Sequence, residues 1–84
     1  MSTLRDELLQ AVELALAGKW DAAHHLVQQH EEDATAAWIH AVLHKIEGDA
    51  GNSRYWYSRS TRSYGDFADL EQEWTALRRA VESA

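Results

Sequence analysis

The chain has 84 residues with no cysteine and no proline, and its 8 basic and 14 acidic residues give a formal net charge of −6. This length suits one small domain, and 45% hydrophobic with 26% charged residues is typical of a folded globular protein. The lack of cysteine excludes disulfides, a thiol nucleophile, an iron–sulfur cluster and cysteine-ligated zinc. The lack of proline favours uninterrupted helices.

Targeting and charge patterns predict the compartment and exclude some partners. The N-terminal sequence has no basic region followed by an apolar run, and no apolar stretch reaches the roughly 20 residues of a membrane span. We therefore expect a cytoplasmic protein that does not bind membranes. Nucleic acid is an unfavourable general partner, because its phosphates repel an acidic chain.

Apolar residues at helical spacing predict a helical hairpin over residues 4–30. Thr3 and Asp6 form a capping-box pattern before the first helix, and Gly18 ends that helix. Asp21 is a candidate cap for the second helix. The apolar positions of the two helices are Leu4, Leu8, Val12, Ala15, Leu16, Ala22, Ala23, Leu26 and Val27.

A second hairpin is predicted over residues 34–61. Asp33 can cap its first helix, and Gly48 and Gly51 are expected to break that helix. Asn52 is the candidate cap of the next one. The apolar positions are Ala34, Ala37, Trp38, Ala41, Val42, Leu43 and Ile46, followed by Tyr55, Trp56 and Tyr57.

A C-terminal helix is predicted over residues 66–83, with Asp66 as its cap. Its apolar residues recur at steps of three and four and form a seam of Phe67, Leu70, Trp74, Leu77 and Val81. The seam can cover the hairpins or join two chains, so monomer and homodimer both stay open. The predicted fold class is all-α.

An internal repeat relates the two hairpins at an offset of 30 residues. Gly18 aligns with Gly48. The small residues Ala23 and Ser53, each five positions after a glycine, would let the two helices of a hairpin approach closely. The other aligned pairs are Leu8 with Trp38, Ala11 with Ala41, Val12 with Val42, Leu16 with Ile46, Leu26 with Trp56, and Val27 with Tyr57.

This pattern resembles the tetratricopeptide repeat family over about residues 4–61. The residues that match are Trp38, Gly48, Ser53 and Tyr57 in the second copy, and Leu8, Gly18, Ala23 and Val27 in the first. The resemblance implies two stacked antiparallel hairpins with a capping helix. It also implies a non-catalytic module that binds a peptide or a protein surface through a helical groove. The offset of 30 is shorter than the family's period of about 34, and the usual proline is absent.

The stretch from Ala37 to Tyr57 also resembles a group of short uncharacterised bacterial proteins, which implies no activity. The chain has no nucleophile elbow, no phosphate-cradling glycine loop and no dinucleotide-binding fingerprint. We therefore expect no enzymatic activity and no cofactor.

Histidines offer one alternative function, a small metal-binding protein. His40 and His44 are four residues apart, so their rings share a helix face at a spacing that can hold a transition metal. His24 could supply a third ligand if the hairpins pack as predicted, and Glu47 or Asp49 could supply an oxygen. In the structural alternative, His40 and His44 flank the apolar stripe and form only local hydrogen bonds.

Residues 52–65 are the only basic segment, with three arginines and no acid. Its candidate partner-binding residues, for an anion or single-stranded nucleic acid, are Arg54, Tyr55, Arg59, Arg62 and Tyr64. In the alternative that we favour, the arginines serve folding. Trp56 and Tyr57 would then pack inward, Tyr55 would cover the hairpin edge, and the arginines would pair with carboxylates such as Glu47, Asp49, Asp66 and Asp69.

Overall fold

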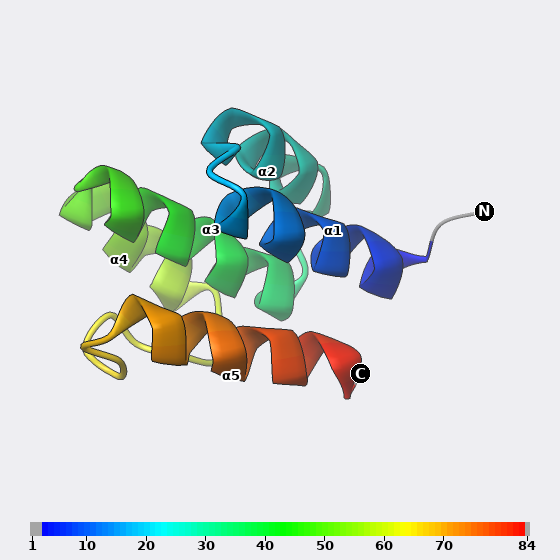
Figure 1. Cartoon of the computed structure of the whole chain (residues 1–84). Coiled ribbons are helices and arrows are strands. Elements are labelled where there is room, and N and C mark those ends of the chain that lie inside the picture. Colours follow the sequence, from blue (N-terminus) through cyan, green and yellow to red (C-terminus); the bar gives the residue numbers. More distant parts are fainter. Residues whose placement is uncertain (1–2, 84) are drawn as a thin grey trace.

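The computed structural model describes residues 3–83, which fold as five α-helices and one short 3₁₀ helix (Figure 1). In chain order these are α1 (Leu4–Leu16), α2 (Trp20–Val27), η1 (Gln28–His30), α3 (Ala34–Glu47), α4 (Ala50–Ser58) and α5 (Leu70–Glu82). No strand occurs within this range, so the predicted all-α class is confirmed. None of these helices combines the length and the apolar character needed to cross a bilayer.

The two predicted hairpins are present, since α1 packs on α2 and α3 packs on α4. Gly18 and Gly48 make the two turns with φ angles of 78° and 85°, as the repeat requires. This left-handed conformation is readily adopted only by glycine. Ala23 and Ser53 are both fully buried, and the Ser53 hydroxyl donates to the Ala41 carbonyl at 2.8 Å. Small residues at these positions therefore allow close helix approach.

The apolar stripes of α1 and α3 stop earlier than predicted. Leu16 is 52% exposed and its repeat equivalent Ile46 is 43% exposed, although both were expected in the core. Each lies in the last turn of its helix, next to the glycine turn. The apolar stripe of each helix therefore ends before the helix does.

Two predicted caps of the shorter helices are wrong. Asp49, not Asn52, caps α4, and its side chain accepts the Asn52 backbone N–H at 3.1 Å. The helix starts earlier than expected because the Asp49 side chain already satisfies a free backbone donor. Gly51 lies inside the first turn of α4 and does not interrupt a helix, although it was expected to do so. Lys19 occupies the N-cap position of α2 without a side-chain hydrogen bond, and Asp21 lies in the first turn.

The C-terminal helix is shorter than the predicted range 66–83. Its cap is Asp69, whose side chain accepts a backbone N–H of the first turn of α5 at 2.9 Å. Asp66 instead accepts the Ser63 backbone N–H at 2.9 Å and closes a turn of the preceding connection. Phe67 therefore lies before the helix, where it still packs against the core.

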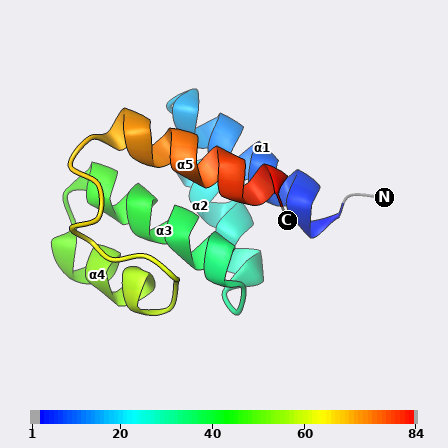
Figure 2. The ribbon, with the colours of Figure 1, turned by 90° about the horizontal axis from the view of Figure 1, so that it is seen from below.

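Helix α5 lies across α1 and α3, which Figure 2 shows from below. Trp74, Leu77 and Val81 are buried in this contact, while Leu70 is exposed. Most of the predicted seam thus packs within one chain, where its apolar area is removed from water. The seam does not require a second chain, and the choice between monomer and homodimer stays a prediction.

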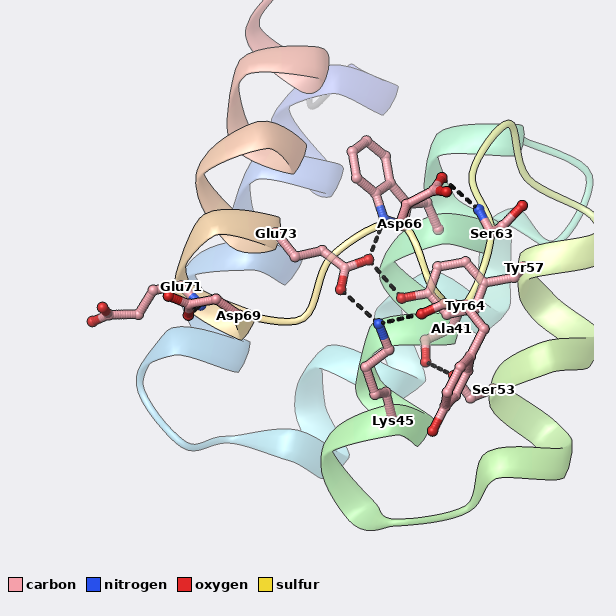
Figure 3. Close-up of polar contacts among 11 residues, drawn as sticks. Ala41, Lys45, Ser53, Tyr57, Ser63, Tyr64, Asp66, Asp69, Glu71 and Glu73 are labelled. Atoms are coloured by element: carbon pink, nitrogen blue, oxygen red, sulfur yellow. Dashed lines mark hydrogen bonds and ion pairs between the residues drawn. The ribbon is translucent and has the colours of Figure 1, made fainter.

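A buried carboxylate ties α5 to the second hairpin (Figure 3). Glu73 is fully buried and accepts hydrogen bonds from Trp38 Nε1 at 2.9 Å and the Tyr57 hydroxyl at 2.5 Å. Lys45 Nζ donates to the same carboxylate at 2.9 Å and to the Tyr64 carbonyl at 3.1 Å. Burial, and then the Glu73 carboxylate, raise the pKa of Tyr57 far above its usual range, so the hydroxyl remains a donor.

Candidate metal centre

Three histidine rings meet where α2 packs against α3. His40 and His44 stand one turn apart on α3, and His24 reaches them from α2. Their ring centroids are 4.7 Å apart for His24 and His40, and 5.1 Å apart for each of the other two pairs. One ligand nitrogen from each ring lies within 4.8 Å of the other two. The structure thus brings together all three residues that the sequence singled out.

The closest approach in this cluster joins two nitrogens of the same kind. The Nε2 atoms of His24 and His40 are 3.1 Å apart. Two neutral imidazoles can form a hydrogen bond at this distance only if one of them carries its proton on Nε2. A tetrahedral ion with Zn–N bonds of about 2.0–2.1 Å would hold two such atoms about 3.3 Å apart. Replacing the shared proton with a metal ion therefore needs only a small movement of the rings.

Glu47 orients the third ring. The Nδ1 atom of His44 lies 2.6 Å from the Glu47 carboxylate, so Nδ1 carries a proton and donates it to this carboxylate. A carboxylate on the far nitrogen is the usual partner of a metal-binding histidine, because it fixes the ring and makes the ligand more basic. Asp49 completes a second cluster with His44 and Glu47 within 4.8 Å. Both carboxylates that the sequence suggested thus lie beside His44.

Two tryptophans stack on the rings of His24 and His40 and hold these rings in place. Trp20 stacks on His24 at 4.6 Å between centroids, and Trp56 stacks on His40 at 3.9 Å. The indole of Trp20 is itself held by a 2.7 Å hydrogen bond from Nε1 to the Leu43 carbonyl. Neither tryptophan was expected in the site from the sequence. The spacing of four residues between Trp20 and His24 would have been a usable sign, whereas nothing local connects Trp56 to His40.

Burial favours the neutral form of two of these imidazoles, those of His24 and His40. His40 is 2% exposed, and burial followed by repulsion from His24 and His44 lowers its pKa to about 3. Burial, and then His44, also lower the pKa of His24, against the pull of nearby carboxylates of which Glu47 is the strongest. Metal ions bind the neutral form of histidine, so no proton must leave either ring first. The same carboxylates make the site attractive to a cation.

His40 also carries an unpaired nitrogen. Within residues 3–83, its Nδ1 is the one buried side-chain nitrogen or oxygen that lacks a hydrogen-bond partner. An unsatisfied buried polar atom costs about 1–3 kcal/mol, so most folded proteins avoid it. Because its pKa is far below neutral, the ring does not gain a second proton in compensation. His40 therefore carries a free-energy cost that an apolar residue at this position would not have.

The arginines of the basic segment do not bind carboxylates. Within residues 3–83, Arg54, Arg59 and Arg62 form no ion pair, so the pairing that we expected with neighbouring acids is wrong. Arg54 lies over the Tyr64 ring at 4.6 Å. Arg62 lies over the Trp38 ring at 4.8 Å. The guanidiniums instead lie over aromatic rings, whose faces attract cations. A guanidinium is weakly hydrated, so it loses little hydration free energy in such a contact.

The inward packing predicted for Trp56 and Tyr57 is confirmed, since Tyr57 is buried and Trp56 is half-buried. Tyr55 is 52% exposed. Arg59 lies 5.8 Å from the Trp56 ring and 6.0 Å from the Tyr55 ring. Arg59 thus lies beside Trp56, which stacks on His40 of the cluster. The other two belong to a separate hollow.

Comparison with known proteins adds no family. No family model matches the chain, and no curated protein or solved structure is significantly similar to it. The resemblance to tetratricopeptide repeats therefore stays a prediction from the residues of the two hairpins. Any functional proposal must come from the side chains themselves.

Proposed function

We propose that this protein binds a late first-row transition-metal ion, taken as Zn²⁺, through His24, His40 and His44. The observation that carries the proposal is the 3.1 Å approach of two Nε2 atoms from different helices, with a third histidine ring beside both. Imidazole is a preferred ligand of zinc, copper and nickel. Imidazole ligands are neutral, so the bound ion keeps its full positive charge. The nearby carboxylates stabilise this charge.

The surroundings support a metal site over a simple packing role for the histidines. Glu47 accepts a hydrogen bond from Nδ1 of His44, so Nε2 is the nitrogen of this ring available to an ion. Trp20 and Trp56 restrict the other two rings. Three protein ligands leave a fourth position for water or an oxygen ligand, as in open zinc sites. A packing role alone would not require three mutually contacting imidazoles.

The test is a zinc titration of chelator-treated protein without a histidine tag, followed by calorimetry and by thermal unfolding. We expect one ion per chain and a Tm that rises with zinc concentration, because an ion that binds only the folded state stabilises it. His24→Gln should weaken binding at least tenfold. The matched control is His25→Gln, which changes the adjacent, exposed histidine of the same helix and should leave the affinity unchanged.

Two results would overturn this proposal. One is a titration that shows no saturation at one equivalent. The other is an equal loss of affinity in the His24→Gln and His25→Gln proteins, which would assign zinc binding to surface histidines. His44→Asn provides a second variant if His24→Gln unfolds.

Binding of a peptide or protein surface, implied by the family resemblance, is a second proposal. Helix α5 covers the face of α1 and α3, so such a partner would meet α5 as well. A hollow of about 480 Å³ there is lined by Leu16, Glu71, Trp74, Thr75 and Arg78. The exposed Leu16 supports this position. Leu16→Ser should then abolish crosslinking to a partner while leaving zinc affinity unchanged, and unchanged crosslinking would exclude this surface.

A further inference from the structure

A second hollow lies on the second hairpin, between α4 and the connection that leads from α4 to α5. Its volume is about 200 Å³, and its walls are Arg54, Tyr57, Ser58, Arg62, Ser63 and Tyr64. Sites for drug-sized ligands usually measure about 300–1,000 Å³. This hollow is thus suited to one small polar group. None of its residues belongs to the histidine cluster.

Two guanidiniums line this hollow without a carboxylate partner within residues 3–83. Arg54 is stacked on the ring of Tyr64, and Arg62 is stacked on the ring of Trp38. Stacking uses the face of a guanidinium and leaves its N–H donors free at the edge. It also restricts two long side chains in advance, so less conformational entropy is lost when a ligand binds.

Some of the hydroxyl groups that line the hollow already donate a hydrogen bond, and others do not. The Tyr57 hydroxyl donates to the buried Glu73, and the Ser58 hydroxyl donates to the Tyr55 carbonyl. The Ser63 hydroxyl makes no hydrogen bond within residues 3–83, so it remains available as a donor. Within residues 3–83 the Tyr64 hydroxyl makes no hydrogen bond either, so the free donors of the hollow are two guanidiniums and the hydroxyls of Ser63 and Tyr64. This set matches an oxyanion with several acceptor oxygens.

The charges near the hollow favour a doubly charged ligand. Asp66 lies at its edge, where its carboxylate accepts the Ser63 backbone N–H (Figure 3). Glu73 contributes little net field, because the Lys45 ammonium neutralises it at 2.9 Å. Two arginines against one carboxylate leave a net positive site on an acidic protein. A dianion gains more from this site than a monoanion does.

We propose that the hollow between Arg54 and Arg62 binds the phosphoryl group of inorganic phosphate or of a phosphate monoester. Single-stranded nucleic acid fits this hollow less well, because its bases need free aromatic faces and guanidiniums already cover those of Tyr64 and Trp38. The small volume also excludes a base beside the phosphate. This site is independent of the proposed metal centre.

The experiment follows the Arg54 and Arg62 side-chain Nε–H signals by NMR during titration with inorganic phosphate and, separately, with phosphoserine. Potassium chloride keeps the ionic strength constant. We expect saturable shifts with both probes. A response to phosphoserine alone would identify a monoester as the ligand, and a response to phosphate alone would identify the free ion.

Variants decide between a built site and general charge attraction. Arg54→Gln and Arg62→Gln should each weaken phosphate binding at least tenfold with unchanged helicity. Arg59→Gln removes the same charge outside the hollow and should weaken it less than twofold. If either glutamine variant unfolds, Ser63→Ala provides the same test with an expected loss of about threefold to tenfold for one hydrogen bond.

Three outcomes would overturn the proposal. The first is a linear response that potassium chloride reproduces, and the second is an equal loss in the Arg59→Gln protein. The third is tighter binding of a single-stranded oligonucleotide that depends on Arg59 and Tyr55, which would assign the segment to nucleic acid. Phosphate binding that survives in the His24→Gln protein would separate this site from the metal centre.

Discussion

The Nε2 atoms of His24 and His40 lie 3.1 Å apart across the contact between α2 and α3, although the residues are 16 positions apart in the chain. Only one proton can occupy the space between them, so the pair is either a single hydrogen bond or two ligands of one ion. His44 adds a third ring to the same point.

Glu47→Gln should weaken zinc binding about 10- to 100-fold, because His44 loses the carboxylate that fixes its tautomer and raises its basicity. Competition with a chromogenic chelator measures the change. Glu32→Gln removes the same charge from an exposed residue of the α2–α3 connection and serves as the control. Equal affinities of the Glu47→Gln and unsubstituted proteins would show that this hydrogen bond does not serve a metal.

The metal-free protein should lose stability as the pH falls below about 6.5. Burial beside His24 and His44 lowers the pKa of His40 to about 3, so the unfolded chain binds a proton that the folded chain does not. Stability from this group is complete above pH 6.5 and declines by up to about 1.4 kcal/mol per pH unit down to pH 3. Urea unfolding in chelator between pH 7 and pH 5 measures the slope, before most carboxylates titrate.

His40→Phe is the matched variant for this slope, because phenylalanine can keep the stack on Trp56 without a titrating group. Its stability should depend less on pH across the same range. A slope equal to that of the unsubstituted protein would assign the effect to other groups.

Glu73→Ala should destabilise the fold by about 3–5 kcal/mol, because it leaves the ammonium of Lys45 half-buried and without its carboxylate. Tyr57→Phe removes one buried hydrogen bond of the same carboxylate and should cost about 1–3 kcal/mol. Gln72→Ala, on the exposed side of α5, should change stability by less than about 0.5 kcal/mol. Urea unfolding compares the three, and similar values for all would contradict a stabilising role of Glu73.

Gly18→Val and Gly48→Val should each cost on the order of 1 kcal/mol or more, because a β-branched residue disfavours the left-handed backbone at both turns. A Cβ atom would meet no other atom within 4 Å at either site, so the cost comes from the backbone alone. Gly65→Ala, also in open space but without a positive φ, is the control. Thermal unfolding that shows no difference between these variants would contradict the turn role.

Local sequence rules were sufficient for the first helix and the turn of each hairpin. Thr3 with Asp6, and Asp33, cap their helices as predicted, since a capping side chain reaches only the next few backbone N–H groups. Gly18 and Gly48 take the left-handed turns for the same local reason. At the starts of α4 and α5 the caps are Asp49 and Asp69 instead of the predicted Asn52 and Asp66, because residues of similar capping ability lie within three positions of each other. Each choice depended on where the preceding connection had to lie.

The sequence by itself determined which residues share a helix face, and therefore placed His40 and His44 side by side. Only the tertiary structure decided that His24 meets them, that Trp20 and Trp56 hold the rings, and that the arginines stack on aromatic rings instead of pairing with acids. The physical reason is the separation along the chain over which each kind of interaction acts. Capping and helical spacing act over a few residues, whereas the partner of a charge or a ring depends on which helix faces meet and on how much water remains there.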